Sequence, residues 1–147
     1  MAEKTEIELL ITVLVAAEDD RGARAACLEL TRSVGGRVVE SGDCSDEEPG
    51  CWSVTISRGG GTGGSHVAAA LARSVRTFMR ELAPEHALPR ISCAPPTAWT
   101  VLEEPGLLDS LVSGGERILV EAWWGGSALT ATPAASTSAD DPRIPRP

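Results

Sequence analysis

The residues of this chain whose types could do chemistry are few and scattered. His66 and His86 have no cysteine or aspartate at the spacing of a metal site or a catalytic triad, so we expect both at the surface. Glu103 and Glu104 directly precede Pro105, an order that is typical of the start of a helix rather than of an acid/base pair. The sequence therefore predicts no catalytic residues, no cofactor and no metal ligands.

A glycine-rich segment between a predicted strand and a predicted helix matches a nucleotide-binding pattern. Gly59, Gly61 and Gly64 have the Gly-x-Gly-x-x-Gly spacing of a dinucleotide loop. Such a loop needs a parallel βαβ unit, whereas the strand before it belongs to a predicted hairpin and the next extended segment contains prolines. We therefore interpret residues 59–64 as a flexible connection to a helix capped by Ser65, where free N–H groups would suit an anion.

Composition limits the domain organisation and the partners. The 147 residues fit one domain, which we place at residues 1–124, and a tail at 125–147 whose Pro, Ala, Ser and Thr content predicts disorder. A net charge of -8 disfavours nucleic acid. Without a long apolar stretch or a leader-like N-terminus, we expect no membrane contact and a cytoplasmic location. The cysteines form no Cys-x-x-Cys pair, so we expect reduced thiols.

Hydrophobic periodicity organises the chain around its first strand. Residues 7–15 are apolar on both alternating faces and rich in β-branched side chains, which predicts a central strand. The later elements predicted by spacing are a helix over 20–34, hairpin strands over 37–40 and 51–57, a helix over 65–82, an extended segment over 91–102, a helix over 105–113 and a strand over 116–124. This order predicts an α+β fold, a ferredoxin-like βαββαβ sandwich with an added C-terminal helix and strand.

Several short segments together resemble an ACT domain, a small ligand-sensing module of amino-acid metabolism. They are residues 12–16, the turn 19–23, the helix that ends at Gly35 and Gly36, residues 37–41 and the strand 51–56. The resemblance implies a non-enzymatic regulatory domain that binds an amino-acid-like ligand, usually across a homodimer interface. It places the ligand at the first strand-to-helix turn, where glycine lets the backbone approach it. The family usually has proline before this glycine, where this chain has arginine. The implied ligand-binding residues are Asp19, Asp20, Arg21, Gly22 and Ala23.

The sequence also supports a different function, an acidic protein-binding module, such as an immunity protein or an adaptor, that engages a basic partner. The loop between the hairpin strands is acidic, and two adjacent tryptophans point to opposite faces of the last strand, so one of them suits an interface unless both lie in the core. The candidate contact residues are Asp43, Asp46, Glu47, Glu48, Trp123 and Trp124. A small enzyme with a cavity on the open sheet face is disfavoured, because the sequence shows no nucleophile with a base.

Overall fold

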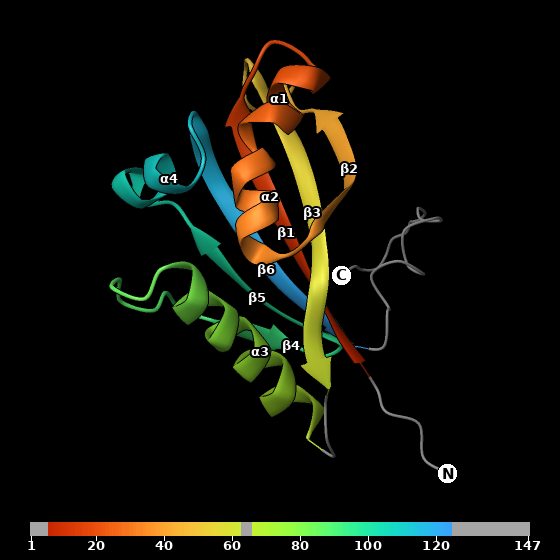
Figure 1. Ribbon diagram of the computed structural model, residues 1–147. Helices are drawn as coiled ribbons and strands as arrows, with labels where there is room; N and C mark the ends of the chain where they lie inside the picture. The colour runs from red at the N-terminus through yellow and green to blue at the C-terminus, as the bar shows by residue number, and fades with distance from the viewer. Residues whose placement is uncertain (1–5, 63–65, 125–147) are drawn as a thin grey trace.

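The computed structural model describes residues 6–62 and 66–124, which form a mixed α+β fold. One antiparallel sheet of six strands has the order β2-β3-β1-β6-β5-β4 (Figure 1). Its strands are β1 (Glu6–Ala16), β2 (Arg37–Asp43), β3 (Cys51–Thr62), β4 (Ser92–Ala94), β5 (Thr97–Leu102) and β6 (Gly115–Trp124). The helices are α1 (Asp20–Ala26), α2 (Leu28–Val34), α3 (Val67–Leu82) and α4 (Pro105–Leu111).

Two of the sequence predictions lie outside the described residues. They are the helix cap at Ser65 and the tail over 125–147. Within the described ranges, no helix is long and apolar enough to cross a membrane.

β1 is the central strand, as its sequence predicts. It pairs with β3 on one side and with β6 on the other, so that Ile11 lies between Ile56 and Val120. These three side chains are fully buried. Most backbone groups of β1 are hydrogen-bonded on both edges, with a register shift between Glu6 and Glu8 on one side and between Leu14 and Val15 on the other, so β1 fixes the positions of the strands beside it.

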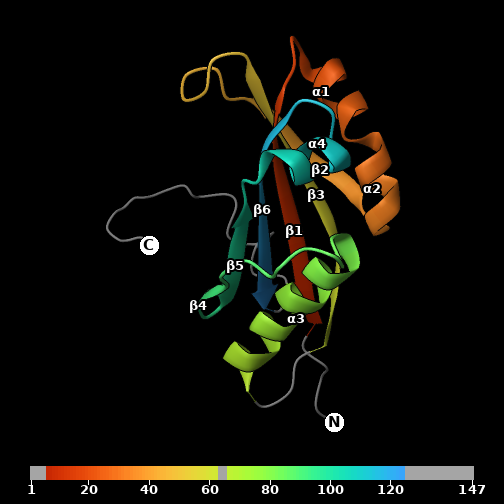
Figure 2. The same ribbon diagram turned by 90° about the vertical axis from the view of Figure 1, so that its left-hand side faces the viewer.

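The helices all cover the same face of the sheet (Figure 2). Alternate residues of β1 are buried beneath them, namely Ile7, Leu9, Ile11, Val13 and Val15. The opposite face carries no helix from the described part of the chain, and Glu8, Leu10 and Thr12 of β1 are partly exposed there. We call this second side of the sheet the helix-free face.

The predicted helix over residues 20–34 is divided into α1 and α2 at Cys27. This residue has φ -96° and ψ 3°, and the hydroxyl of Thr31 donates to its carbonyl at 2.7 Å. A side-chain hydroxyl that bonds back to the preceding turn tends to bend a helix. The predicted end at Gly35 is confirmed, because this glycine has a left-handed φ of 68°. The predicted buried stripe is also confirmed, at Ala23, Cys27, Leu30 and Val34.

Residues 59–62 belong to a strand, so the predicted flexible connection is wrong for them. They extend β3 and pair with the first residues of β1. A Cβ at Gly60 would lie 2.8 Å from Oγ of Ser74 and 2.9 Å from Cγ2 of Ile7. Glycine is needed at this position because α3 packs directly on the strand, where the Ser74 hydroxyl donates to the Gly60 carbonyl at 2.8 Å.

The strand order differs from the predicted arrangement in the place of the later strands. The segment 91–102, predicted as the fourth strand of the sandwich, forms the hairpin of β4 and β5, with a cis peptide bond between Pro95 and Pro96 in its turn. This hairpin lies outside β6, whereas β6, predicted as the added strand, pairs directly with β1. Proline cannot donate to a ladder, and β6 has no proline over its ten residues, which suits β6 to the more central position.

Local predictions near α4 and at the histidines are confirmed. The carboxylate of Glu104 accepts a hydrogen bond from the N–H of Leu107 at 2.7 Å and so caps α4, with Pro105 as the first helical residue. His66 and His86 are both exposed.

Candidate functional site

A groove lined mainly by apolar side chains lies over β5 and β6 on the helix-free face. Its cavity has a volume of about 780 Å³. We call it the aromatic groove, because two indole rings, those of Trp99 and Trp123, are among its walls. Its lining residues are Thr97, Trp99 and Val101 from β5, Leu119, Glu121 and Trp123 from β6, and Ala94, Pro95 and Pro96 from the hairpin of β4 and β5.

The groove exists because β5 and β6 carry large side chains on the face that points away from the helices. In both strands the even-numbered residues, 98–102 and 118–122, are buried on the side of the helices. Since side chains alternate along a strand, the odd-numbered residues stand on the helix-free face. The register then places Trp99 opposite Glu121, and Val101 opposite Leu119.

Glu121 is the ionisable side chain of the aromatic groove. Burial raises the pKa of its carboxyl above the ordinary glutamate value, and the nearby indole N–H of Trp123 partly offsets this shift. Nε1 of Trp123 and Oγ1 of Thr97 are both buried without a regular hydrogen-bond partner among the described residues. Unpaired buried polar groups cost free energy, so a ligand or a water that pairs with them is favoured.

The predicted ligand-binding turn is the capped start of α1. Oδ1 of Asp19 accepts the N–H of Gly22 at 2.7 Å, so the donor that this glycine would offer a ligand is already used. A Cβ at Gly22 would lie 3.2 Å from the same oxygen, so glycine leaves room for the cap. Ala23 is fully buried and Arg21 is exposed. The ligand at this turn stays a prediction.

Asp20, also predicted to bind ligand, joins α1 to β2. Its carboxylate accepts hydrogen bonds from Nε of Arg24, at 3.1 Å, and from the hydroxyl of Ser41. The Ser41 hydroxyl is the main cause of a lowered pKa at Asp20, and the Arg24 guanidinium acts in the same direction. The carboxylate is therefore already paired with groups of the chain itself.

A hollow of about 590 Å³ lies next to this turn. Two carboxylates line it, those of Glu18 and Asp43, and the Asp43 carboxylate accepts the N–H of Ser45 at 2.8 Å. The side-chain hydroxyl of Ser45 is the main cause of a lowered pKa at Asp43, and this backbone N–H acts in the same direction. None of the residues 19–23 lines it. The hollow therefore borders the predicted turn without using its residues.

The predicted partner-binding residues lie at opposite ends of the sheet. The acidic loop joins β2 to β3 near the end of β1, where Cys51 is opposite Ala16. Trp123 is opposite Glu8, near the start of β1. Eight residues of extended strand span about 26 Å, so the structure does not bring the two groups together. Trp124 packs against the core. The loop carboxylates, all exposed, are those of Asp43, Asp46, Glu47 and Glu48.

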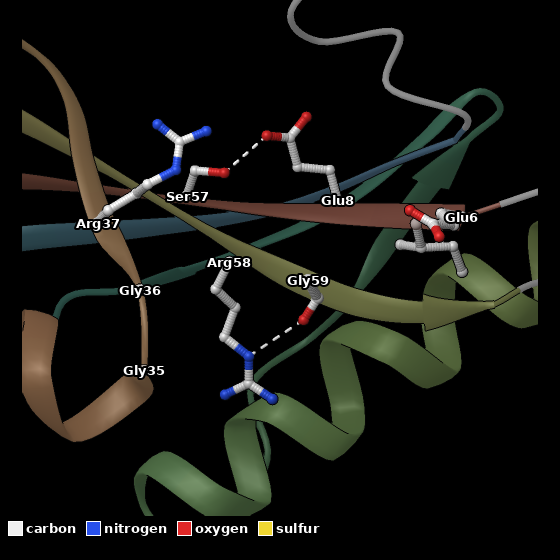
Figure 3. A pocket seen from close by; sticks show the side chains of 9 residues that line it. Glu6, Glu8, Gly35, Gly36, Arg37, Ser57, Arg58 and Gly59 are labelled. Carbon is white, nitrogen blue, oxygen red and sulfur yellow. Dashed lines mark hydrogen bonds between the residues drawn. The ribbon is translucent and has the colours of Figure 1, made fainter.

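Another hollow, of about 510 Å³, lies at the start of β1 (Figure 3). Its two arginines extend to opposite sides of β3. Arg58 reaches toward α3, where Glu81 holds it at 3.1 Å. Arg37 lies on the other side near Ser57, whose hydroxyl donates to Glu8 at 2.6 Å. Arg58 and one oxygen of Glu8 already have partners, whereas Oε1 of Glu8 is buried without one among the described residues. This hollow therefore keeps a polar group for a ligand, but it lacks the aromatic walls of the groove.

Sequence reasoning missed Trp99 and Glu121 as site residues. The pattern that could have indicated them is the presence of large outward-facing side chains on two strands whose inward faces are already apolar. Within residues 6–62 and 66–124, no three His, Cys, Asp or Glu side chains gather in a way that could hold a metal ion.

Comparison with known proteins returns no relative. No protein-family model matches the chain, and neither a curated protein nor a solved structure matches it.

Proposed function

We propose that this protein is a non-enzymatic binding domain that holds a small ligand with an ammonium group in the aromatic groove. Trp99 and Trp123 offer flat apolar walls, and Glu121 offers a carboxylate between them. Ammonium groups are attracted both to the faces of indole rings and to carboxylates. The observation that carries the proposal is the position of Glu121 opposite Trp99 in the β5–β6 ladder.

The chemistry of the groove suits the ammonium group and the apolar body of an amino-acid-like amine. The proposal keeps the amino-acid-like ligand that the ACT resemblance implies and moves its site from the turn 19–23 to the groove. A cavity of about 780 Å³ has the size of small-molecule sites in general. Glu121 is the one ionisable side chain among the nine residues that line the groove, so the lining lacks the paired groups of acid/base catalysis. This composition favours binding over turnover.

The same proposal extends to the fold and the assembly. We interpret the fold as a variant of the ferredoxin-like sandwich in which β6 takes the fourth strand's place beside β1 and the segment from β4 to α4 is an insertion. The order β2-β3-β1-β6 and the helices on one face support this interpretation. The edge strands β2 and β4 have unpaired backbone groups that a second copy of the chain could hydrogen-bond in a homodimer. The mass of the purified protein in solution tests the dimer.

Calorimetric titration with two probes of similar shape tests the proposed ligand class. The probes are 2-phenylethylammonium and the neutral 2-phenylethanol, and we expect the ammonium probe to bind more tightly. Glu121→Gln is expected to weaken ammonium binding about 10- to 150-fold, because a hydrogen bond to a charged group contributes roughly 1.5–3 kcal/mol. Glu116→Gln removes an exposed carboxylate of the same strand and serves as the matched control.

Three outcomes would reject the groove as the ammonium site. They are equal affinity for both probes, no binding of either probe, and a loss of ammonium affinity in the Glu116→Gln control that equals the loss in Glu121→Gln. A Gly22→Val variant separates the groove from the turn. If this variant stays folded and no longer binds the ammonium probe, while Glu121→Gln still binds it, the ligand binds at the turn.

A second candidate function is binding of a basic protein through the acidic loop. No ion pair within the described residues involves Asp43, Asp46, Glu47 or Glu48, so their charge is available to a partner. An oligolysine peptide is a suitable probe, and its association rate should fall steeply with added salt. Replacing Asp46, Glu47 and Glu48 by their amides should remove most of this attraction. An association rate that does not change in this variant would reject the loop as the contact.

A further inference from the structure

The aromatic groove also has the chemistry of a site for a proline-rich segment. Trp99 and Trp123 are diagonal neighbours, because Trp99 is opposite Glu121 and Trp123 is opposite Thr97. Diagonal side chains of an antiparallel pair lie about 7–8 Å apart. Extended proline-rich segments dock on aromatic-lined grooves, where the rings of proline stack on the aromatic rings.

The chain itself contains a segment with matching spacing. Residues 142–147 read Pro-Arg-Ile-Pro-Arg-Pro. A polyproline II helix has three residues per turn and a rise of about 3.1 Å, so Pro142 and Pro145 would share one edge at a spacing of about 9 Å. Arg143 and Arg146 would share a second edge. The proline spacing is close to that of the two indoles, and the arginine edge complements a carboxylate.

The segment is within reach of the groove. Trp123 lines the groove, and residues 125–141 connect this end of β6 to the segment. The sequence predicts disorder over this stretch, and a disordered chain of its length has a root-mean-square span of about 20–25 Å. Tethering at that distance gives an effective concentration in the millimolar range, so a weak contact is enough for substantial occupancy.

We infer that residues 142–147 bind in the aromatic groove of their own chain, with the prolines on the indoles and an arginine at Glu121. The guanidinium of arginine would take the place of the ammonium group at the carboxylate, since both are cations that stack on indole rings. This inference rests on the proposed function, because it assigns the regulation of the same groove. The segment competes with the ammonium ligand and lowers its apparent affinity.

The test compares the full chain with its Arg143→Glu/Arg146→Glu variant by NMR of the indole N–H groups. We expect the resonances of Trp99 and Trp123 to move. The resonance of Trp52, which lies in β3 opposite Asp43 and does not line the groove, should stay. We also expect 2-phenylethylammonium to bind the variant about 2- to 10-fold more tightly, because the tethered competitor is removed. The matched control is Arg73→Glu/Arg80→Glu, which makes the same charge change on the exposed face of α3 and should show neither effect.

Addition of the free peptide Pro-Arg-Ile-Pro-Arg-Pro to the variant should return the two indole resonances toward their positions in the unmodified chain. Unchanged resonances of Trp99 and Trp123 in the variant would overturn the inference, whether or not the ammonium probe binds. Moved resonances without any probe binding would support the segment and overturn the proposed ammonium ligand. Resonance positions that depend on protein concentration would overturn docking within one chain and assign the contact to a second copy.

Discussion

Trp99 lies directly opposite Glu121 in the β5–β6 ladder, on the face of the sheet that the described helices leave uncovered. The carboxylate therefore stands beside an indole instead of in bulk water, and burial raises its pKa. The Glu121 carboxylate should therefore affect both the pH dependence of the free energy of unfolding and the binding that we propose for the groove.

The stability of the protein should fall as the pH rises above the ordinary glutamate value of 4.5, through the titration of Glu121. Because burial raises the pKa of this carboxyl in the folded protein, the folded state holds the proton more tightly than the unfolded state does. The stabilisation is fully present below the unfolded pKa and is lost as the pH rises through the folded pKa. Urea unfolding of the unmodified chain and of Glu121→Gln should show a difference that grows in favour of the variant over this range. A difference that stays constant with pH would contradict the prediction.

Replacement of Gly60 by alanine should destabilise the protein by about 1–3 kcal/mol, the usual cost of overpacking. The new Cβ would lie 2.8 Å from Oγ of Ser74 in α3 and 2.9 Å from Cγ2 of Ile7 in β1, so the side chains or backbone on both sides of Gly60 would have to shift. Gly59→Ala is the matched control, since nothing lies within 4 Å of its Cβ position. We expect the control to change the free energy of unfolding by no more than about 0.5 kcal/mol. Equal effects of the two substitutions in urea unfolding would show that the close contact is unimportant.

Removal of the α1 cap should destabilise the protein without changing the proposed binding. Asp19→Ala leaves the N–H of Gly22 without its acceptor and should cost about 1 kcal/mol, whereas Asp19→Asn keeps an acceptor and should cost little. Thermal unfolding measures both. If the groove is the ligand site, both variants bind 2-phenylethylammonium as the unmodified chain does. A loss of binding in Asp19→Asn would return the ligand to the turn.

The four cysteines should differ widely in reactivity toward a thiol reagent such as N-ethylmaleimide. Burial raises the pKa of the Cys27 thiol to about 11, so very little of the reactive thiolate is present at neutral pH. Cys93 is exposed and should be labelled first. Mass spectrometry of the labelled protein should find Cys27 unmodified until denaturant is added. Labelling of Cys27 at the rate of Cys93 in the native protein would contradict this order.

Much of the local structure could be predicted from the sequence. The apolar run of residues 7–15 predicts the central strand, Gly35 predicts the end of α2, and Glu104 before proline predicts the start of α4. Each of these features depends on residues close together in the chain. Gly60 shows the limit of such reasoning, since its glycine is required by the approach of α3 and not by a flexible loop.

The candidate groove and the strand order could not be predicted in the same way. Trp99 and Glu121 become neighbours only because β5 pairs with β6, and nothing in either strand alone specifies that partner. The same holds for β6, which pairs with β1 across almost the whole described chain. Pairing of this kind is decided by which strands bury their faces best together, and local spacing does not carry that information.

The central place of β1 has a consequence for how the protein is made. During synthesis, β3 becomes available to pair with one edge of β1 well before β6 is made. The other edge stays unpaired until then, so Val13 pairs with Ile118 only after most of the chain has been synthesised. At roughly 5–20 residues per second, the interval between the completion of β3 and that of β6 is about 3–12 s. During this time the nascent chain would present an apolar strand with an open edge, which is the kind of surface that chaperones recognise and through which chains aggregate.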